Sequence, residues 1–430
     1  MSETATAPLV LDPPAAPNQG LGRMATTLVG SEILRIAAEV RTLREQGRPV
    51  LNLTVGDFSP REFRIPRPLE EGIVRALEAG QTNYPPSDGV GELRQAVREF
   101  YARRLGLDYP LDGILVAGGA RPLIWSAYRA VVDPGDAVVY PVPSWNNNHY
   151  CHLVDARGIA VETRAENGFL PTAEELAPHL GEAVLLALNS PLNPAGSGFG
   201  REQLAAIARL VVDENRRRGP HAKPLYLLYD QIYWLLADDA VGHATPVGLV
   251  PEVAPYTVFV DGISKAFAAT GLRVGWTAGP PFLVSRMRDL LGHVGAWAPK
   301  PEQVATAGIL ADPVAAAALA EAVRDGVAAR LAALDRGLAG LAAKGYPVRH
   351  LPPSGALYLS VHFDLVERLG NNRAIRQFLL EQAGFAMVPF HAFGTADDNG
   401  WFRLSVGAVG LDEIPEAIAR VESALATLAR

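Results

Sequence analysis

The middle of the chain alternates between short continuous runs of apolar residues and stretches whose apolar residues recur every three or four positions. The continuous runs lie at 113–117, 137–140, 184–188, 225–229, 257–260 and 273–277. Helically spaced stretches lie before or between them, at 69–79, 91–104, 172–180 and 201–215. Continuous apolar strands that alternate with amphipathic helices are typical of a mostly parallel sheet covered on both faces. The pattern therefore predicts an α/β fold with a large central sheet.

The pattern changes at about residue 305. A long Ala- and Leu-rich helical stretch is followed by shorter strand-like and helical segments, at 313–344, 356–361, 372–383, 401–406 and from 411 onward. These segments indicate a second, smaller α+β domain. The helical stretch at 31–46 and the apolar run at 50–55 are expected to join it. The expected division is a small domain of residues 31–60 and 305–430 and a large domain of residues 61–304.

Residues 1–30 begin with a segment rich in Ala, Pro and Thr and without periodicity. This composition predicts an N-terminal arm that is either disordered or extended across a dimer partner. The arm lacks the basic and apolar regions of a secretory signal, and arginine and proline residues interrupt the most apolar long stretch, 114–132. We therefore expect no membrane-spanning helix.

Charge and cysteine content narrow the function class. The net charge is −7 and no long basic run exists, which argues against nucleic-acid binding. The short cluster Arg216–Arg218 is interpreted as the solvated end of a helix. Cys151 is the single cysteine, so the chain cannot form an internal disulfide and no metal site is expected. These features predict a soluble protein of the cytoplasm.

The candidate chemistry centres on Lys265. This lysine follows Ser264 and an apolar run, and the segment 270–275, Thr-Gly-Leu-Arg-Val-Gly, comes shortly after it. A lysine that forms a Schiff base needs a fixed position and a lowered pKa, which burial beside other positive groups provides. Arg273 is such a group and can reach the same anion. An ordinary loop lysine is the alternative, and the segments around Lys265 decide against it.

Four other segments, each at the end of a predicted strand, carry groups that can bind different parts of a ligand attached to Lys265. Gly118–Pro122 begins a helix whose free backbone N–H groups can hold a phosphate. Trp145 can stack on a planar ring, and Asn193 is held extended by the next proline. Asp230 ends a buried strand, where a protonated pyridine nitrogen is a suitable partner. Each segment alone fits a structural role, but their order along one sheet is hard to explain by chance.

With these segments the sequence resembles the fold-type I enzymes that depend on pyridoxal 5′-phosphate (PLP), and within them the class I and II aminotransferases of the aspartate aminotransferase-like superfamily. The resemblance runs from about residue 30 to the C-terminus. It is carried by Asn193-Pro194-x-Gly196, Asp230-x-x-Tyr233, Ser264-Lys265, Thr270-Gly271-x-Arg273-x-Gly275 and Arg403-x-Ser405. It implies a three-layer fold whose large domain binds PLP, and a homodimer with active sites at the subunit interface.

The resemblance also implies a role for each residue that contacts the cofactor ring. Lys265 would bind PLP covalently and then move a proton between the substrate Cα and the cofactor. Asp230 would pair with the pyridine nitrogen, which makes the ring an electron sink. Tyr233 and Asn193 would donate hydrogen bonds to the phenolic oxygen, and Trp145 would stack on the ring.

The same resemblance implies two anion sites. The phosphate would be held by Gly119, Ala120, Arg121, Ser264 and Arg273. Tyr84 would reach the phosphate of the neighbouring subunit. The substrate α-carboxylate would be bound by Arg403, Asn193 and the turn at Gly56, because a guanidinium makes two parallel hydrogen bonds to a carboxylate.

The sequence departs from the family at several positions. Ala195 and Gln231 replace the usual threonine and glutamate, and Gly262 stands where many members have a phosphate-binding serine. Arg121 occupies the place where relatives often carry lysine followed by glutamine. In some dicarboxylate-specific relatives that lysine meets the distal carboxylate, so Arg121 indicates an acidic substrate such as aspartate. Binding of Arg121 to phosphate alone, or to an acidic neighbour, is the equally weighted alternative.

The sequence therefore predicts an aminotransferase that moves an amino group from an L-amino acid to a 2-oxo acid by a ping-pong mechanism. Another PLP-dependent reaction at Cα on the same fold, by a C–S lyase, decarboxylase or cyclase, stays open as the alternative. A regulatory protein of this fold would need an added DNA-binding domain, for which residues 1–30 are too short. A dinucleotide-binding oxidoreductase is disfavoured because no Gly-x-Gly-x-x-Gly joins a first strand to a helix.

Overall fold

The computed structural model describes residues 20–238, 242–396 and 398–428. The chain divides into two compact units, Met1–Gly30 and Ser31–Arg430. In the first unit, helix α1 covers Arg23–Thr27, and residues 1–19 of the expected N-terminal arm lie outside the described residues.

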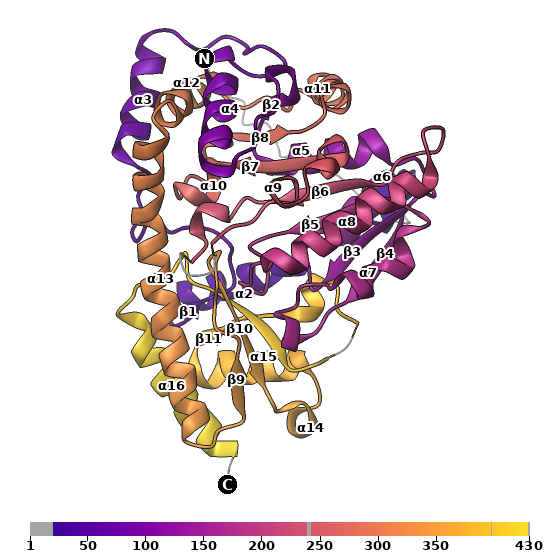
Figure 1. Cartoon of the computed structure of the whole chain (residues 1–430). Helices are drawn as coiled ribbons and strands as arrows, with labels where there is room; N and C mark the ends of the chain where they lie inside the picture. The colour runs from indigo at the N-terminus through magenta and orange to yellow at the C-terminus, as the bar shows by residue number, and fades with distance from the viewer. Residues whose placement is uncertain (1–19, 239–241, 397, 429–430) are drawn as a thin grey trace, which may run out of the picture. The chain divides into compact units, whose positions relative to one another are not determined.

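A seven-stranded sheet forms the centre of the larger part of this unit (Figure 1). Its described strands are β2 (Ile114–Ala117), β3 (Ala137–Val142), β4 (Arg157–Glu162), β5 (Ala183–Asn189), β6 (Tyr226–Asp230), β7 (Thr257–Gly262) and β8 (Gly275–Ala278). The spatial order is β2-β8-β7-β6-β5-β3-β4, and only β8 runs antiparallel to its neighbours. The predicted mostly parallel sheet is confirmed.

Helices cover both faces of this sheet. One face packs on α5 (Ala120–Val131), α6 (Asn147–Val154) and α11 (Pro281–Val294). The other packs on α4 (Gly91–Leu105), α7 (Ala173–Leu180), α8 (Arg201–Arg218) and α12 (Lys300–Leu310), with α3 (Arg67–Glu78) and the short α9 (Pro246–Leu249) beside them. Leu227 and Tyr229 of β6 face the second group, and Leu228 faces the first. Burial on both faces explains why the strands are continuous apolar runs.

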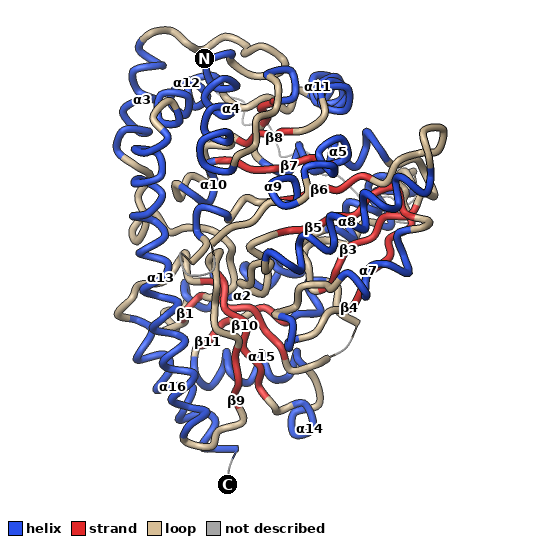
Figure 2. The backbone as a smooth tube through the Cα atoms, in the orientation of Figure 1, coloured by secondary structure: helices blue, strands red, loops and turns tan. Residues whose placement is uncertain are grey.

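The smaller part contains an antiparallel sheet of order β12-β13-β10-β9. Its strands are β9 (Val348–His350), β10 (Tyr358–Phe363), β12 (Val388–Pro389) and β13 (Trp401–Ser405), and a separate parallel pair joins β1 (Leu51–Asn52) to β11 (Phe385–Ala386). The surrounding helices are α2 (Glu32–Glu45), the long α13 (Pro313–Ala343), α14 (Val366–Leu369), α15 (Asn372–Ala383) and α16 (Glu413–Leu428). Figure 2 shows these strands in red among blue helices. The boundaries near residues 60 and 305 stay a prediction, because 31–430 is one compact unit.

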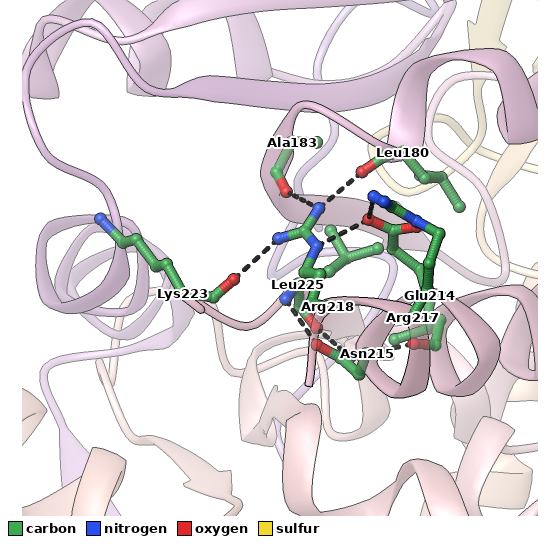
Figure 3. Close-up of polar contacts among 9 residues, drawn as sticks. Leu180, Ala183, Glu214, Asn215, Arg217, Arg218, Lys223 and Leu225 are labelled. Atoms are coloured by element: carbon green, nitrogen blue, oxygen red, sulfur yellow. Dashed lines mark hydrogen bonds and ion pairs between the residues drawn. The ribbon is translucent and has the colours of Figure 1, made fainter. Parts of the chain in front are cut away.

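The arginine cluster at the end of α8 corrects one expectation. Arg216 and Arg217 are exposed, but the Arg218 side chain is only 9% exposed. Its guanidinium donates to the carbonyl oxygens of Leu180, Ala183 and Lys223 and binds the Glu214 carboxylate at 2.6 Å, as Figure 3 shows. Arg218 therefore ties the end of α7, the start of β5 and the loop before β6 to α8, and is not a solvated residue.

The sequence predicts no membrane-spanning helix. Within the described residues, no single helix is long and apolar enough to cross a membrane. The bent pair α12 and α13, whose axes differ by 105°, meets the criteria of length and composition when taken together.

Candidate active site

Lys265 lies on the short helix α10 (Ile263–Ala266), which directly follows β7. The connection is tight because β7 ends at Gly262, packed against the neighbouring strand. A Cβ atom on Gly262 would lie 2.6 Å from the Val274 oxygen and 2.8 Å from the Gly275 Cα. Glycine at this position, instead of the serine of many relatives, therefore matches the local packing. The Lys265 Nζ donates a hydrogen bond to the Gly56 oxygen at 2.6 Å.

The Lys265 amine lies in a positive and largely desolvated environment. Burial lowers its pKa to about 8; Asp57 opposes this shift, and Arg403, Arg121 and Arg273 add to it. Charge repulsion and desolvation both disfavour the ammonium form. The amine therefore reaches its neutral, nucleophilic form at a lower pH than an exposed lysine does. The same three arginines provide positive charge for anionic groups of a ligand.

Asp230 ends β6, on the strand next to β7. Burial raises the pKa of Asp230 to about 7, and a backbone hydrogen bond from Ile232 and the charge of Lys265 oppose this rise. Within the described residues, no cationic side chain lies within ion-pair distance of its carboxylate. Burial without a close cation leaves the carboxylate suited to a positively charged ligand atom.

Arg403, in the middle of β13, is 1% exposed. Its Nη1 donates to the Asn193 Oδ1 at 2.9 Å and its Nη2 donates to the Thr54 oxygen at 2.5 Å. Its Nε has no hydrogen-bond partner among the described residues. The guanidinium carbon lies 4.7 Å from the ring centre of Tyr358 and 4.8 Å from that of Phe393. The fork is thus held in place and still has N–H groups available for a carboxylate.

The amide of Asn193 and the hydroxyl of Tyr233, both predicted to donate to the phenolic oxygen of the cofactor, lie in this group. The Asn193 Oδ1 accepts from Arg403, which leaves its Nδ2 as a donor, and its backbone N–H binds the Asn189 side chain. The Tyr233 hydroxyl lies 2.7 Å from the Tyr358 hydroxyl, and its ring centre is 5.8 Å from the Lys265 Nζ. Asn193, Tyr233, Lys265 and Arg403 are therefore brought together.

The predicted phosphate site is at the start of α5. Gly119 precedes this helix with φ 91°, a conformation that favours glycine, and a Cβ there would collide with the Arg273 guanidinium. A Cβ on Gly275 would lie 2.5 Å from the Gly119 carbonyl carbon. Arg273 donates to the Gly118 and Thr270 oxygens. The arginine is thereby fixed beside the first turn of α5, where the N–H groups of Ala120 and Arg121 have no partner within the helix, which suits a phosphate.

The remaining predicted site residues are Arg121, Trp145, Ser264 and Tyr84. The Arg121 guanidinium carbon lies 4.6 Å from the Trp145 ring centre, and Ser264 is buried at the start of α10. Tyr84 is 82% exposed and packs edge-to-face on Trp297, with 5.3 Å between ring centres. Among the described interactions, none joins Tyr84 to the Lys265 group within one chain.

Three residues of the site were missed by sequence reasoning. The rings of Tyr358 and Phe393 contact the Arg403 guanidinium. The Tyr150 hydroxyl is buried and has no hydrogen-bond partner among the described residues. The Tyr150 ring centre lies 6.3 Å from that of Trp145. The only sequence signal for Tyr358 is an aromatic residue soon after Gly355, at the start of a predicted strand. Such residues are ordinary in cores, so the sequence could not single them out.

Taken together, the residues fit PLP. The buried carboxylate of Asp230 suits a protonated ring nitrogen, and the start of α5 with Arg273 suits a phosphate. The Lys265 amine, with its pKa lowered by burial, suits covalent attachment to a carbonyl carbon.

Comparisons with known proteins agree with this fit. The family model described as "Aminotransferase class I and II" matches residues 48–421. The aspartate aminotransferase of Rhizobium meliloti is 30% identical over 408 residues, covering 92% of this chain and 93% of that protein. The aspartate/prephenate aminotransferase of Thermus thermophilus is 32% identical, covering 87% of this chain and 93% of that protein.

Solved structures show the same fold. The structure of the Thermus thermophilus aspartate aminotransferase with maleate matches with a TM-score of 0.85 at 29% identity, covering 94% of this chain and all of that one. The structure of the Rhizobium meliloti aspartate aminotransferase also matches with a TM-score of 0.85, at 28% identity. The expected three-layer fold is confirmed by these matches. The chain belongs to the class I and II aminotransferases, and it is a PLP-dependent enzyme that transfers amino groups between amino acids and oxo acids.

Proposed function

We propose that this aminotransferase acts on a dicarboxylic L-amino acid, aspartate in the first place, and transfers its amino group to a 2-oxo acid by a ping-pong mechanism. The observation that carries the proposed transamination is that two side chains bind the same short segment, residues 54–56. Lys265 donates to the Gly56 oxygen and Arg403 donates to the Thr54 oxygen. An amine that can attack the cofactor and a guanidinium that can bind a carboxylate thus converge on one short segment, as a reaction at the Cα of an amino acid requires.

Each group of residues has a proposed task in holding PLP. The backbone of Gly119, Ala120 and Arg121 and the side chains of Ser264 and Arg273 hold the phosphate, while Trp145 lies against the ring. Asp230 binds the ring nitrogen, and Tyr233 and Asn193 donate to the phenolic oxygen. When bound, PLP supplies an electron sink for the electrons released at the substrate Cα.

Lys265 moves the proton in this proposal. The neutral amine accepts the proton of the substrate Cα and returns it to the cofactor carbon that receives the amino group. Its pKa, lowered by burial to about 8, keeps the cost of the neutral amine small near neutral pH. Arg403 holds the α-carboxylate, so that the Cα–H bond is presented to Lys265 in one orientation.

Arg121 is the proposed partner of the distal carboxylate. Its side chain is exposed, stacks on Trp145, and has no carboxylate within ion-pair distance among the described residues. The positive charge of Arg121 adds to the lowering of the Lys265 pKa. The names of the Rhizobium and Thermus relatives point to the same class of substrate.

The selectivity of Arg121 can be measured directly. Arg121→Gln should lower kcat/KM for aspartate more than for alanine, because only aspartate has a distal carboxylate to lose the contact. Arg129→Gln, an exposed arginine of the same helix, is the matched control. Equal losses for both amino acids would limit Arg121 to the phosphate.

We also propose a homodimer in the cytoplasm. The aromatic side chain of Tyr84 is 82% exposed. Val294, which lies three residues before Trp297 in the chain, is 60% exposed. Exposed apolar side chains that lie together, such as Tyr84 packed edge-to-face on the partly exposed Trp297, are typical of subunit contacts. Light scattering of the purified protein tests the dimer, and a monomer at micromolar concentration would contradict it.

An absorption spectrum tests the central proposal. The band of the lysine-bound cofactor should bleach on addition of aspartate or glutamate alone, because the first half-reaction converts the cofactor to its amino form. A lyase or decarboxylase would leave the band in place or shift it without bleaching. Bleaching by a different amino acid would retain transamination and exclude the dicarboxylate preference.

A further inference from the structure

Tyr358 contacts both halves of the site at once. It is the first residue of β10 and is 1% exposed. Its hydroxyl lies 2.7 Å from the Tyr233 hydroxyl, and its ring lies 4.7 Å from the Arg403 guanidinium carbon. Tyr233 belongs to the proposed cofactor contacts and Arg403 to the proposed substrate contacts, so Tyr358 connects them through one side chain.

The position of Tyr358 is fixed from several sides. A Cβ on Gly56 would collide with the Tyr358 hydroxyl, and one on Gly196 would collide with the Tyr358 carbonyl oxygen. Two residues along β10, the Ser360 hydroxyl donates to the Ala195 oxygen at 3.1 Å. The start of β10 is thus fastened to the loop that carries Asn193.

The geometry allows either hydroxyl to donate in the hydrogen bond between the two tyrosines. Burial raises the pKa of Tyr233 well above its usual value; burial also raises the pKa of Tyr358, where the Arg403 charge is the main opposing influence. A hydroxyl has one proton, and in the proposed function Tyr233 donates it to the cofactor, so Tyr358 is the donor of this bond when the cofactor is bound. Tyr233 then keeps its own proton for another acceptor, and a donor that itself accepts a hydrogen bond donates more strongly.

The Tyr358 ring acts on Arg403. The guanidinium lies between Tyr358 and Phe393, at 4.7 and 4.8 Å from the two ring centres. Its Nη1 and Nη2 are fixed by Asn193 and Thr54. A planar cation held between two aromatic faces keeps its orientation when a carboxylate arrives.

We propose that Tyr358 is a positioning residue with two separable effects: its hydroxyl strengthens Tyr233 as a donor to the phenolic oxygen of the cofactor, and its ring holds Arg403 in position for the substrate carboxylate. This inference rests on the proposed function, in which Tyr233 and Arg403 have those tasks.

The hydroxyl effect is tested by a pH titration of the absorption band of the cofactor-bound enzyme. Tyr233→Phe should raise the midpoint by about 1–2 pH units, the size of one lost hydrogen bond to a charged oxygen. Tyr358→Phe should raise it by about a tenth to a third of that amount, the size of cooperative strengthening. Tyr109→Phe is the matched control, because Tyr109 is 8% exposed and its hydroxyl has no partner among the described residues. Its midpoint should equal that of the parent protein.

The ring effect is tested by substrate binding. Tyr358→Leu should raise the KM for the amino acid about thirtyfold, the size of one desolvated contact between a cation and an aromatic ring. Tyr358→Phe keeps the ring and should leave this KM nearly unchanged. The thermal midpoints of both variants, measured without cofactor, show whether they are folded.

The outcomes separate the inference from the proposed function. A midpoint that moves for Tyr233→Phe and not for Tyr358→Phe overturns the hydroxyl effect. If the midpoint changes in neither variant, Tyr233 does not donate to the cofactor. The proposed hydroxyl effect of Tyr358 is then overturned as well. A folded Tyr358→Leu with unchanged KM overturns the ring effect. If Tyr358→Leu does not fold, the ring effect is judged by Phe393→Leu, which removes the opposite ring and should raise the KM by a similar factor.

Discussion

Replacing Arg403 with lysine tests how the site binds the substrate carboxylate. An arginine has five N–H donors, and Arg403 uses two of them on the Asn193 side chain and the Thr54 oxygen. The others, including the Nε–H that has no partner among the described residues, are available for a carboxylate. A lysine has three N–H donors, so it can satisfy both internal acceptors and still offer one donor to the substrate.

The expected loss follows from this difference. A bidentate contact becomes a single one, and a hydrogen bond to a charged group contributes about 1.5–3 kcal/mol. Arg403→Lys should therefore raise the KM for aspartate by a factor of about 10–150. The absorption band of the lysine-bound cofactor should remain, because Arg403 does not hold the cofactor in the proposed arrangement.

The assay compares KM and kcat for aspartate with the cofactor spectrum of the same sample. Arg420→Lys is the matched control, since Arg420 donates to the Ala383 oxygen and to Glu416 on α16 and belongs to no part of the site. Its KM should be unchanged. An unchanged KM for Arg403→Lys would refute the reasoning, and the carboxylate would then have to bind elsewhere.

Three further predictions concern the cofactor lysine, a structural arginine and a buried carboxylate. Lys265→Ala should abolish the visible absorption band and multiple turnover. The control Lys344→Ala, on the surface, should change neither. Turnover of Lys265→Ala at the parent rate would contradict the assignment. Arg218→Ala should lower the free energy of unfolding in urea by about 3–5 kcal/mol, because it breaks a buried ion pair and three carbonyl contacts; a loss below that of exposed Arg216→Ala would contradict it. Burial raises the pKa of Asp261 from 3.8 to about 7, so the folded protein binds more protons than the unfolded chain in that window and loses stability as the pH rises through it. Asp261→Asn should therefore raise the thermal midpoint of the cofactor-free protein more at pH 8 than at pH 5, and parallel curves would refute this.

Local sequence signals were sufficient for most elements of the fold. Residues 372–383 were predicted as a helix and form α15 with the same bounds, and the predicted helix 313–344 is α13 (Pro313–Ala343). Asp312 caps α13, and proline stands at its first position, which is a strong helix start. By contrast, β4 (Arg157–Glu162) was missed, because this edge strand is mostly exposed and lacks a continuous apolar run.

One strand boundary shows how a tertiary contact overrides a pattern. The apolar run at 273–277 predicted a strand, but β8 begins at Gly275. Arg273 has φ 56° and lies in a loop, where its guanidinium binds the Gly118 and Thr270 oxygens. The sequence gives no sign of this, because the partner that fixes Arg273 is about 155 residues away in the chain.

The sequence by itself determined the type of sheet, the family and the residue types that can hold PLP, because these depend on periodicity and on short motifs whose residues are neighbours in the chain. The tertiary structure decided the order of the strands, the antiparallel direction of β8, and the convergence of Lys265 and Arg403 on one turn. It also decided which ordinary core residues act at the site, as with Tyr358, and which charged residue is structural, as with Arg218. Those outcomes depend on contacts between distant segments, where burial and charge are set by three-dimensional neighbours and not by neighbours in sequence.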